Sequence, residues 1–520
     1  MPSLASRVAL VVSVALLLLA APAAAAPPAG GVLLVDRPAS PLLDGANVSF
    51  FDAGGRTMSE DGRYVVFASA ADALHPDTFS QVFRRDLTTA DTVLVSTGPD
   101  GPANGLCGSP SLSADGTKVA FRCGDTGNLV TGVSGNAVYV RDVGAGTTEV
   151  VSRGDGANGP VATSALSPVI SGDGTAVAFV TTDALPANGG TTDVNGATDI
   201  YVRDGTATFL ASVPVGSTTA GGGFGIPGID FDGTAVAFLT QAALAHDNAA
   251  FTDSGSSIDA YLRERTGAHT YLISHGAATQ AGASQGAPPA VSGNGNQVAW
   301  NTSTAVIAAD DNGVLDVYTT TVSTDARTLI SRRSAADGGA VGDGSSGSPA
   351  YPIGPSAVYI AFQTAAQNFG GDGNGPTRDI AVRSIGANTT TLATGTAGGG
   401  TAPDDNTAAP AVSGDGSRVS FVSLATNLGG PRDFQNVFTR AGTQTARLTA
   451  VGQRAVRGQR PDRRRRAPRT QRRRPLRGVQ VEVGRALRPG RRPLLERLPA
   501  RHGDRRVCAR EHRRGRRPRK

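Results

Sequence analysis

The chain has 520 residues, of which 39% are hydrophobic and 5% aromatic, and its formal net charge is +6. That charge is uneven, because residues 451–520 hold 27 of the 49 basic side chains and 5 of the 43 acidic ones. Residues 1–450 are therefore acidic, which excludes a basic nucleic-acid-binding body. No segment after residue 26 approaches the roughly 18 apolar residues of a transmembrane helix.

Residues 1–26 have the layout of a secretory signal peptide. Arg7 precedes the apolar run Val8–Leu19, and small residues surround Ala24–Ala26. A charged start, a short apolar core and a small-residue cleavage point are typical of such peptides. We expect an exported protein that is secreted or held in the periplasm or cell envelope, with no membrane span beyond this peptide. An uncleaved N-terminal tether is the alternative.

A repeat begins after a lead-in segment, residues 27–57, in which Val32–Val35 could supply a closing strand to the last repeat. A short apolar motif ending in an aromatic residue occurs seven times, at spacings of 54 to 62 residues. Its copies are Val65–Phe67, Val119–Phe121, Val177–Phe179, Val236–Phe238, Val298–Trp300, Ile360–Phe362 and Val419–Phe421. Repeats of such length indicate a radial or stacked architecture.

Each repeat contains signals for four short strands and almost none for helix. Turns of the type S-x-D-G or S-x-N-G precede most copies of the motif and predict a hairpin. The sixth copy, residues 352–362, lacks this turn. A second strand pair follows, as in VYVRD (138–142) and TEVVS (148–152). The sequence therefore predicts an all-β fold, a β-propeller with seven in-frame four-stranded blades over residues 58–450, followed by a disordered basic tail.

The repeat pattern P-x-x-S-x-D-G-x-x-V-A-F, then D-[IV]-[FY]-V-R-D and T-x-L-V-S, resembles the WD40-like repeats of TolB-type propellers. The resemblance covers residues 58–450 and is clearest in the second, third and seventh copies. It implies the propeller fold, whereas function does not follow from fold. Because only residues 27–57 lie between the predicted signal peptide and the first repeat, we expect no separate α/β domain such as that of TolB.

The long loops of the predicted blades all fall on one face of the ring. If the strands are named A to D from the axis outward, the A–B and C–D turns are short and the B–C and D–A loops are long, for example residues 181–198 and 213–228. Loops on a rigid scaffold often carry binding residues. We expect a protein or a cell-wall polysaccharide to bind this face of a monomer; loops that merely tolerate length changes are the alternative.

Three B–C loops carry clustered oxygen ligands that suit Ca²⁺. These candidate ligands are Asp193, Asn195 and Asp199; Asp310, Asn312 and Asp316; and Asp372, Asn374 and Asp379. The ligand spacing of a dedicated Ca²⁺ loop is absent. The structural alternative is that Asp and Asn bond the local backbone of turns and satisfy the start of strand C.

Two further features have structural explanations. Cys107 and Cys123 flank the second hairpin, where a two-residue turn would set Gly108 opposite Cys123 and Cys107 one residue away. A disulfide is geometrically plausible and export permits it; free thiols are the alternative. The Arg-Asp end of strand C, as in Arg141 and Asp142, recurs with the blades, so it predicts a ladder between neighbouring blades.

The sequence contains no recognisable catalytic constellation. A G-x-S-x-G nucleophile motif is missing, and the four histidines before the tail lack metal-ligand spacing. The leading interpretation is a non-enzymatic binding or scaffold propeller. The alternative is a propeller enzyme, a hydrolase or lyase acting on carbohydrate, whose carboxylates converge in the axial channel.

Residues 451–520 are arginine-rich, and they contain no Ser, Asn, Ile, Phe, Tyr or Trp. A nucleic-acid-binding arm is one interpretation, but it fits export poorly and offers no aromatic side chain for base stacking. The second interpretation is a shift of reading frame in the gene. One permitted coding of residues 468–480, read one base over, gives PALSADGRYVAF, close to residues 110–121. The sequence thus predicts the out-of-frame translation of an eighth repeat.

Overall fold

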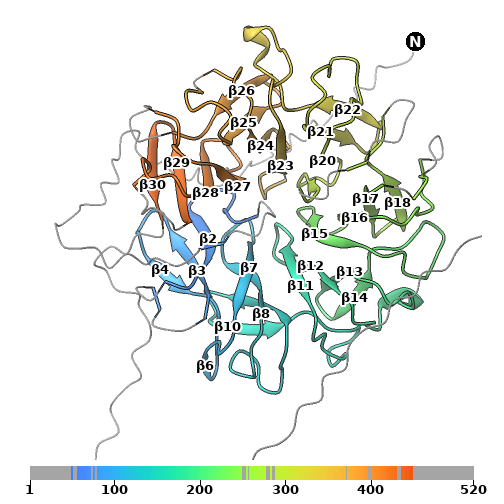
Figure 1. Ribbon diagram of the computed structural model, residues 1–520. Helices are drawn as coiled ribbons and strands as arrows, with labels where there is room; N and C mark the ends of the chain where they lie inside the picture. The colour runs from blue at the N-terminus through green and yellow to red at the C-terminus, as the bar shows by residue number, and fades with distance from the viewer. Residues whose placement is uncertain are drawn as a thin grey trace, which may run out of the picture. The chain divides into compact units, whose positions relative to one another are not determined.

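A computed structural model describes the backbone of Ser49–Phe50 and residues 56–448, except residues 72–73, 76–78, 249–252, 256, 277–281, 284–286, 356, 371, 396–400 and 430–434. The described strands form seven four-stranded sheets arranged in a ring around an axis (Figure 1). This is the β-propeller that the repeats predicted. The only helical turns among the described residues are two 3₁₀ segments, η1 (Asn188–Gly190) and η2 (Ala335–Asp337).

Each blade uses four strands that are consecutive in the chain. The first blade consists of β1 (Ser49–Phe50), β2 (Tyr64–Ser69), β3 (Gln81–Asp86) and β4 (Thr92–Leu94). A small hairpin of β5 (Thr97–Gly98) and β6 (Gly101–Pro102) follows. Blades 2 and 3 consist of β7 (Cys107–Leu112), β8 (Lys118–Cys123), β9 (Ala137–Asp142) and β10 (Thr147–Val150), and of β11 (Leu166–Ile170), β12 (Ala176–Thr181), β13 (Asp199–Asp204) and β14 (Ala207–Leu210).

The remaining blades repeat this antiparallel order, including the sixth, whose turn motif is missing from the sequence. Blades 4 and 5 consist of β15 (Phe224–Ile229), β16 (Ala235–Thr240), β17 (Asp259–Glu264) and β18 (His269–Leu272), and of β19 (Ala290–Val291), β20 (Gln297–Thr302), β21 (Asp316–Thr321) and β22 (Ala326–Leu329). Blades 6 and 7 consist of β23 (Ser346–Ala350), β24 (Tyr359–Thr364), β25 (Asp379–Ser384) and β26 (Thr389–Leu392), and of β27 (Thr407–Val412), β28 (Arg418–Ser423), β29 (Asn436–Ala441) and β30 (Gln444–Arg447).

Aromatic pairs across strands B and C build the core of the blades. Phe121 in β8 lies directly opposite Tyr139 in β9, with their ring centroids 5.8 Å apart. The same pairing occurs in five other blades, as Phe67–Phe83, Phe179–Tyr201, Phe238–Tyr261, Trp300–Tyr318 and Phe421–Phe438. Offset aromatic pairs stabilise a core beyond their area burial, which explains why both motifs contain an aromatic residue.

The serine and the aspartate that recur in the S-x-D-G turn form a small hydrogen-bond network. Ser113 Oγ donates to Asp115 Oδ1 at 2.6 Å and accepts the amide of Lys118 at 3.0 Å. Gly116 has φ = +73°, a left-handed conformation that glycine adopts without strain. The serines of blades 1, 3, 5 and 7 make equivalent bonds, namely Ser59, Ser171, Ser292 and Ser413.

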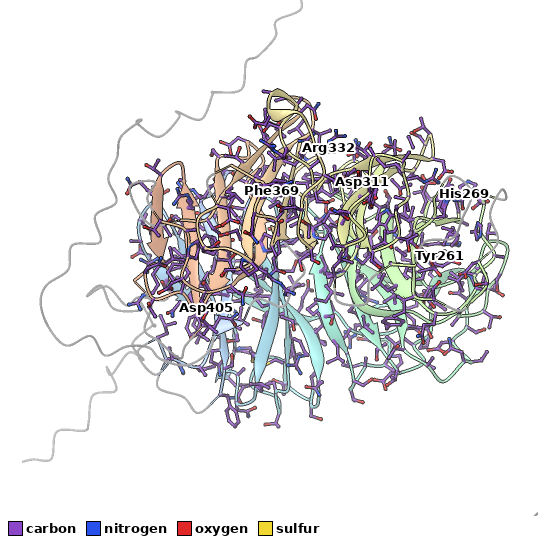
Figure 2. The ribbon with its side chains drawn as sticks, turned by 45° about the horizontal axis from the view of Figure 1, so that its top comes forward. Tyr261, His269, Asp311, Arg332, Phe369 and Asp405 are labelled. Carbon is purple, nitrogen blue, oxygen red and sulfur yellow. A yellow bond between two sulfur atoms is a disulfide. The ribbon has the colours of Figure 1, made fainter. Side chains whose placement is uncertain are left out.

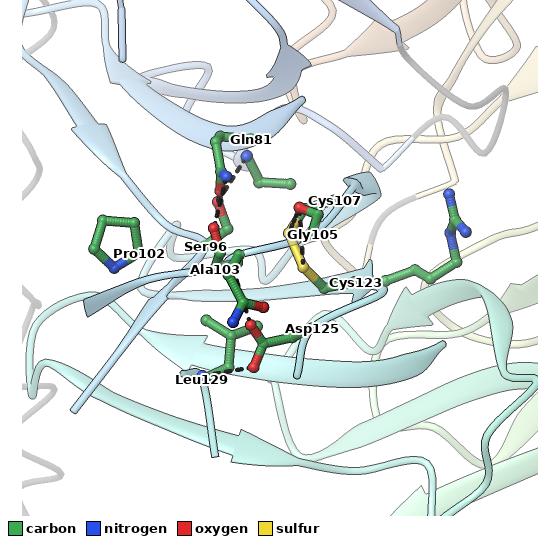
Figure 3. Close-up of a disulfide and its surroundings, with 12 residues drawn as sticks. Gln81, Ser96, Pro102, Ala103, Gly105, Cys107, Cys123, Asp125 and Leu129 are labelled. Carbon is green, nitrogen blue, oxygen red and sulfur yellow. Dashed lines mark hydrogen bonds between the residues drawn. A yellow bond between two sulfur atoms is a disulfide. The ribbon is translucent and has the colours of Figure 1, made fainter. Parts of the chain in front are cut away.

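A β-bulge in the innermost strand corrects the predicted register around the cysteines. Ser109 has φ = +51° and precedes Pro110, and the pairing shifts between Gly108 and Ser111. The bulge inserts one residue, so Cys107 rather than Gly108 lies opposite Cys123. The two cysteines form a disulfide (Figure 3).

The ring closes through contacts of blade 7 with blade 1. The amide of Gly414 donates to the carbonyl oxygen of Glu60 at 2.8 Å. One core cluster joins Met58, Val65 and Phe67 of the first blade to Ala411 and Val422 of the last. The predicted closing segment, Val32–Val35, lies outside the described residues; β1, which belongs to the predicted lead-in, pairs with β2 of the first blade.

Arginines at the end of strand C bond the segment that enters the same blade in blades 2, 3, 6 and 7. Arg141 donates to the carbonyl oxygen of Thr97 at 3.1 Å, and Arg203 donates to that of Gly154 at 2.9 Å. Arg265 of blade 4 also pairs with Asp204 of blade 3 at 3.0 Å. In the part of the chain that the structure describes, no helix has the length and apolarity needed to cross a bilayer.

Candidate functional site

The B–C and D–A loops form one end of the ring, here called the loop face, and the short A–B and C–D turns form the other end, the turn face. Asp311, Arg332, Phe369 and Asp405 belong to loops of the loop face and mark it in Figure 2. Residues 182–198 and 211–223, which lie within or overlap the stretches expected from the sequence, belong to this face.

Carboxylates tie neighbouring loops of the loop face together. Asp183, in the B–C loop of blade 3, accepts the amides of Thr163 at 2.5 Å and Ser164 at 3.1 Å, both in the preceding D–A loop. Asp125 makes the same clamp in blade 2. In blades 6 and 7 the aspartate lies in the D–A loop instead, where Asp343 and Asp404 accept amides of the B–C loop. Loops fixed in this way lose little conformational entropy on binding.

Five of the six exposed large hydrophobic side chains of the described residues lie on the same face. Val194, in the B–C loop of blade 3, is 74% exposed, and Leu106, at the entry of blade 2, is 52% exposed. Among the described residues, the other large hydrophobic side chains with high exposure are Phe79, Leu166 and Leu424 on the loop face and Val358 on the turn face.

The candidate Ca²⁺ ligands are joined to one another by hydrogen bonds. In blade 3, Asn195 Nδ2 donates to Asp199 Oδ2 at 2.8 Å, and Ser212 Oγ donates to Asp199 Oδ1 at 2.5 Å. The hydroxyl of Tyr201 donates to Asp193 Oδ2 at 3.2 Å. Both oxygens of Asp199 therefore already accept hydrogen bonds.

Blades 5 and 6 use their candidate ligands in a similar way. Asn312 Nδ2 and Ser331 Oγ donate to Asp316 at 2.8 and 2.5 Å, and Tyr318 donates to Asp310. In blade 6, Thr394 donates to Asp379 at 2.5 Å. The side-chain amide of Asn374 instead donates to the carbonyl oxygen of Pro403 at 2.9 Å. No described residue donates a hydrogen bond to Asn374 Oδ1. Asp372 Oδ1 accepts the amide of Asn374 at 3.1 Å.

The aspartates that begin strand C are buried, and this changes their acidity. Burial raises the pKa of Asp199 and of Asp316 to about 6, and it raises the pKa of Asp379 as well. Across the described ranges, no three His, Cys, Asp or Glu side chains lie close enough together to hold a metal ion. Ca²⁺ binding at these loops stays a prediction.

The axis of the ring is occupied at the turn face. Glu60 Oε2 accepts the amide of Gly354 at 2.6 Å, which joins blade 1 to blade 6. A Cβ on Gly172 would lie 2.3 Å from the ring of Phe231 and 2.6 Å from the carbonyl oxygen of Ile353. Glu60, Phe231 and Ile353 replace the Gly or Ala that the other blades carry at this position, so these larger side chains fill the centre.

Arg56 occupies the axis farther along strand A. It is 6% exposed, and its Nη2 donates to the carbonyl oxygen of Ile229 and lies 3.4 Å from that of Val291. Burial lowers the pKa of Arg56 to about 10. The axial cavity beside it, lined by serines, prolines, Val169 and Ile226, measures about 10 Å³, the space of one water molecule.

Two sets of residues were missed by the sequence analysis, although signals for both exist. The Ser or Thr two residues after strand D, such as Ser212, bonds the Asp that begins strand C, and both residue types recur together in blades 3 to 6. The axial residues Arg56, Glu60, Phe231 and Ile353 are departures from the repeat. Six blades carry Pro where the first blade carries Arg56.

No family model matches the chain, and no curated protein matches it either. Among solved structures it is similar to TolB from Acinetobacter baumannii, with 16% identity over 64% of this chain and 63% of that chain and a TM-score of 0.36. This chain thus spans less than two thirds of that TolB.

Two further solved structures are similar in fold. The β-propeller domain of the Trilobed protease from Pyrococcus furiosus has 11% identity over 78% of this chain and 96% of that chain, with a TM-score of 0.44. Oligogalacturonate lyase from Vibrio parahaemolyticus has 12% identity over 77% of this chain and 92% of that chain, with a TM-score of 0.41. Similarities at this level assign no activity.

The seven-bladed ring is the fold that the TolB-type residue pattern of the repeats predicts. The chain has a TolB-like β-propeller fold. The S-x-D-G turn, the aromatic pairs and the strand-C arginines of this TolB-like propeller all serve the fold, because each recurs from blade to blade. Residues that break the repeat are therefore the better guides to what is particular to this protein.

Proposed function

We propose that this TolB-like propeller is a non-enzymatic, exported binding or scaffold module of the cell envelope or the extracellular space. Its monomer binds a protein or a cell-wall polysaccharide through the loop face. The observation that carries the proposal is that five of the six exposed large hydrophobic side chains in the described residues, Leu106 and Val194 among them, lie on the face whose loops are clamped by carboxylates. A preorganised apolar surface with polar surroundings suits binding.

The geometry of the axis favours a binder over the alternative carbohydrate enzyme. That enzyme would need carboxylates around an axial pocket large enough for a sugar. The axial cavity has room for about one water molecule, and Arg56 is the only charged residue that lines it in the described part of the chain. Glu60, whose side chain does reach the axis, is engaged with the amide of Gly354.

The test uses matched substitutions on the two faces. Retention of the purified protein on immobilised peptidoglycan, and on an extract of envelope proteins, is measured for the wild type, Leu166→Glu and Val358→Glu. Leu166 on the loop face and Val358 on the turn face are 41% and 44% exposed, so the two changes are comparable. We expect Leu166→Glu to lose retention and Val358→Glu to keep it. Equal retention, or release of soluble sugars by the wild type, would contradict the proposal.

The basic segment 451–520 and the predicted signal peptide, residues 1–26, lie outside the described residues. Two parts of the proposal concern them. Residues 1–26 direct export, and residues 451–520 are the out-of-frame translation of an eighth repeat rather than a nucleic-acid-binding arm. Resequencing the gene tests the second part, since codons that do not encode repeat strands in the shifted frame rule it out. N-terminal sequencing of the exported protein tests the first.

A further inference from the structure

Blade 4 departs from the S-x-D-G pattern at the first position of the turn. Five blades carry Ser at this position, and blade 4 carries Asp230, followed by Phe231, Asp232 and Gly233. The serine is needed only to bond the turn and the start of strand B, as Ser113 does. An aspartate here adds a charge for which the repeat itself has no use.

Asp230 lines a groove on the turn face between blades 4 and 5. The groove has a volume of about 330 Å³, which lies in the range of small-molecule sites. Blade 4 contributes Asp230, Thr234, Glu264 and Tyr271, and the turns of blade 5 contribute Asn294, Asn296 and Ser323. Two acids, amides, hydroxyls and one aromatic ring thus meet in one groove.

The carboxylate of Asp230 is only partly satisfied by the protein. Its side chain is 2% exposed, and Thr234 donates to Oδ2 at 2.9 Å. Its Oδ1 has no hydrogen-bond partner among the described residues. A buried carboxylate without a full set of partners is unfavourable in its charged form, and burial raises the pKa of Asp230 to about 6. A cation bound in the groove would offset this cost by attracting the charged carboxylate.

The charges around the groove favour a cation over an anion. Among the described residues that line it, Asp230 and Glu264 are acidic and none is basic. Asp232, in the same turn, shares the Thr234 hydroxyl with Asp230 and adds a third negative charge. Of the nearby cations, Arg265 is paired with Asp204 of blade 3. Arg56 attracts Asp230 electrostatically but donates to the carbonyl oxygen of Ile229 across the axis and is not among the residues that line the groove.

The equivalent groove between blades 6 and 7 provides a comparison within the same chain. It has a volume of about 480 Å³ and is lined by Tyr359, Ser384, Thr391 and Arg440, with no acidic side chain among its described lining residues. Ser384 occupies the strand position that Glu264 has in blade 4. The acidic character therefore belongs to the groove between blades 4 and 5 and not to the blade interface in general.

We propose that the groove between blades 4 and 5 binds a small hydroxylated ligand through a primary ammonium group. The ammonium lies between Asp230 and Glu264 and donates to their carboxylates. The amides and hydroxyls of Asn294, Asn296 and Ser323 bond the ligand hydroxyls, and Tyr271 packs against its carbon skeleton. Free amino alcohols and amino sugars share this chemistry. The site is independent of the proposed function, because it lies on the opposite face.

The experiment measures binding to the full chain by calorimetry with matched probes. Ethanolamine is compared with ethylene glycol, and glucosamine with glucose; the first pair tests the free amine and the second the amino sugar. We expect at least one amine to bind at least about ten-fold more tightly than its neutral analogue near pH 7. Affinity should fall as the pH falls below about 6, because Asp230, whose charged neighbours are Asp232, Glu264 and Arg56, becomes protonated.

Two variants test whether the ligand binds in this groove. Asp230→Ser introduces the residue of five other blades and should fold, and Glu264→Gln keeps the size of the side chain. Each should weaken amine binding by about ten-fold or more, whereas Ser384→Ala in the comparison groove should not. Neutral analogues that bind as tightly as the amines, absence of binding by both amines, or wild-type affinity in both acidic variants would overturn the proposal.

Discussion

The guanidinium of Arg56 in blade 1 donates a hydrogen bond to the carbonyl oxygen of Ile229 in blade 4, across the axis of the ring. Its second acceptor, the carbonyl oxygen of Val291 in blade 5, lies 3.4 Å away. A single side chain thus connects blades that are distant along the chain. The negative charge of Asp230 opposes the loss of charge that burial imposes on Arg56.

Arg56→Ala should destabilise the propeller by about 2–4 kcal/mol. The change removes a charged hydrogen bond across the axis and leaves buried groups without their partner. The free energy of unfolding from denaturant titration measures the effect. Arg378→Ala is the control, because Arg378 is exposed and its loss should cost less than about 0.5 kcal/mol. Equal stabilities of the two variants would show that the axial bond contributes nothing.

Asp316 should make the protein more stable in mild acid than at neutral pH. Its folded pKa of about 6 lies above the ordinary value of 3.8, so the folded state binds the proton more tightly. This contribution is complete below pH 3.8 and is lost as the pH rises through 6. Relative to Asp316→Asn, the wild type should lose up to about 3 kcal/mol across that window. Parallel pH profiles of the two proteins would contradict this.

His275 should have the opposite effect, because its side chain is buried between blades 4 and 5. Burial and then the charge of Arg327 lower its pKa below the ordinary 6.5. The unfolded chain therefore takes up the proton first, and stability present above pH 6.5 is lost as the pH falls through the lower folded value. Denaturation of His275→Gln should show a shallower acid loss than the wild type. If His275→Gln lost as much stability at low pH as the wild type, His275 would not take up a proton on unfolding.

The disulfide should stabilise blade 2. Cys107 and Cys123 are 16 residues apart in sequence, and a cross-link over such a loop contributes about 2–4 kcal/mol by restricting the unfolded chain. Dithiothreitol should lower the free energy of unfolding of the wild type and of Cys508→Ser. It should leave the double variant Cys107→Ala, Cys123→Ala unchanged. A wild type insensitive to the reductant would show that the bond adds no stability.

The sequence by itself determined the propeller, because the features that specify it are local and repeat. A glycine at positive φ, an aromatic residue in strand B opposite another in strand C and a serine in most A–B turns are readable from short motifs. Even the sixth blade, without the turn motif, forms a four-stranded sheet. The sequence put Cys107 and Cys123 on the two strands of one hairpin, while their register depended on the bulge at Ser109, where a non-glycine residue adopts positive φ.

The tertiary structure alone decided which residues meet at the axis and in the grooves between blades. Arg56 and Ile229 are 173 positions apart, and nothing local in either segment indicates the other. Asp230 and Asn294 line one groove because the ring places the turn of blade 5 beside that of blade 4. Such contacts depend on how blades close around an axis, a property of the assembled ring that no single repeat contains.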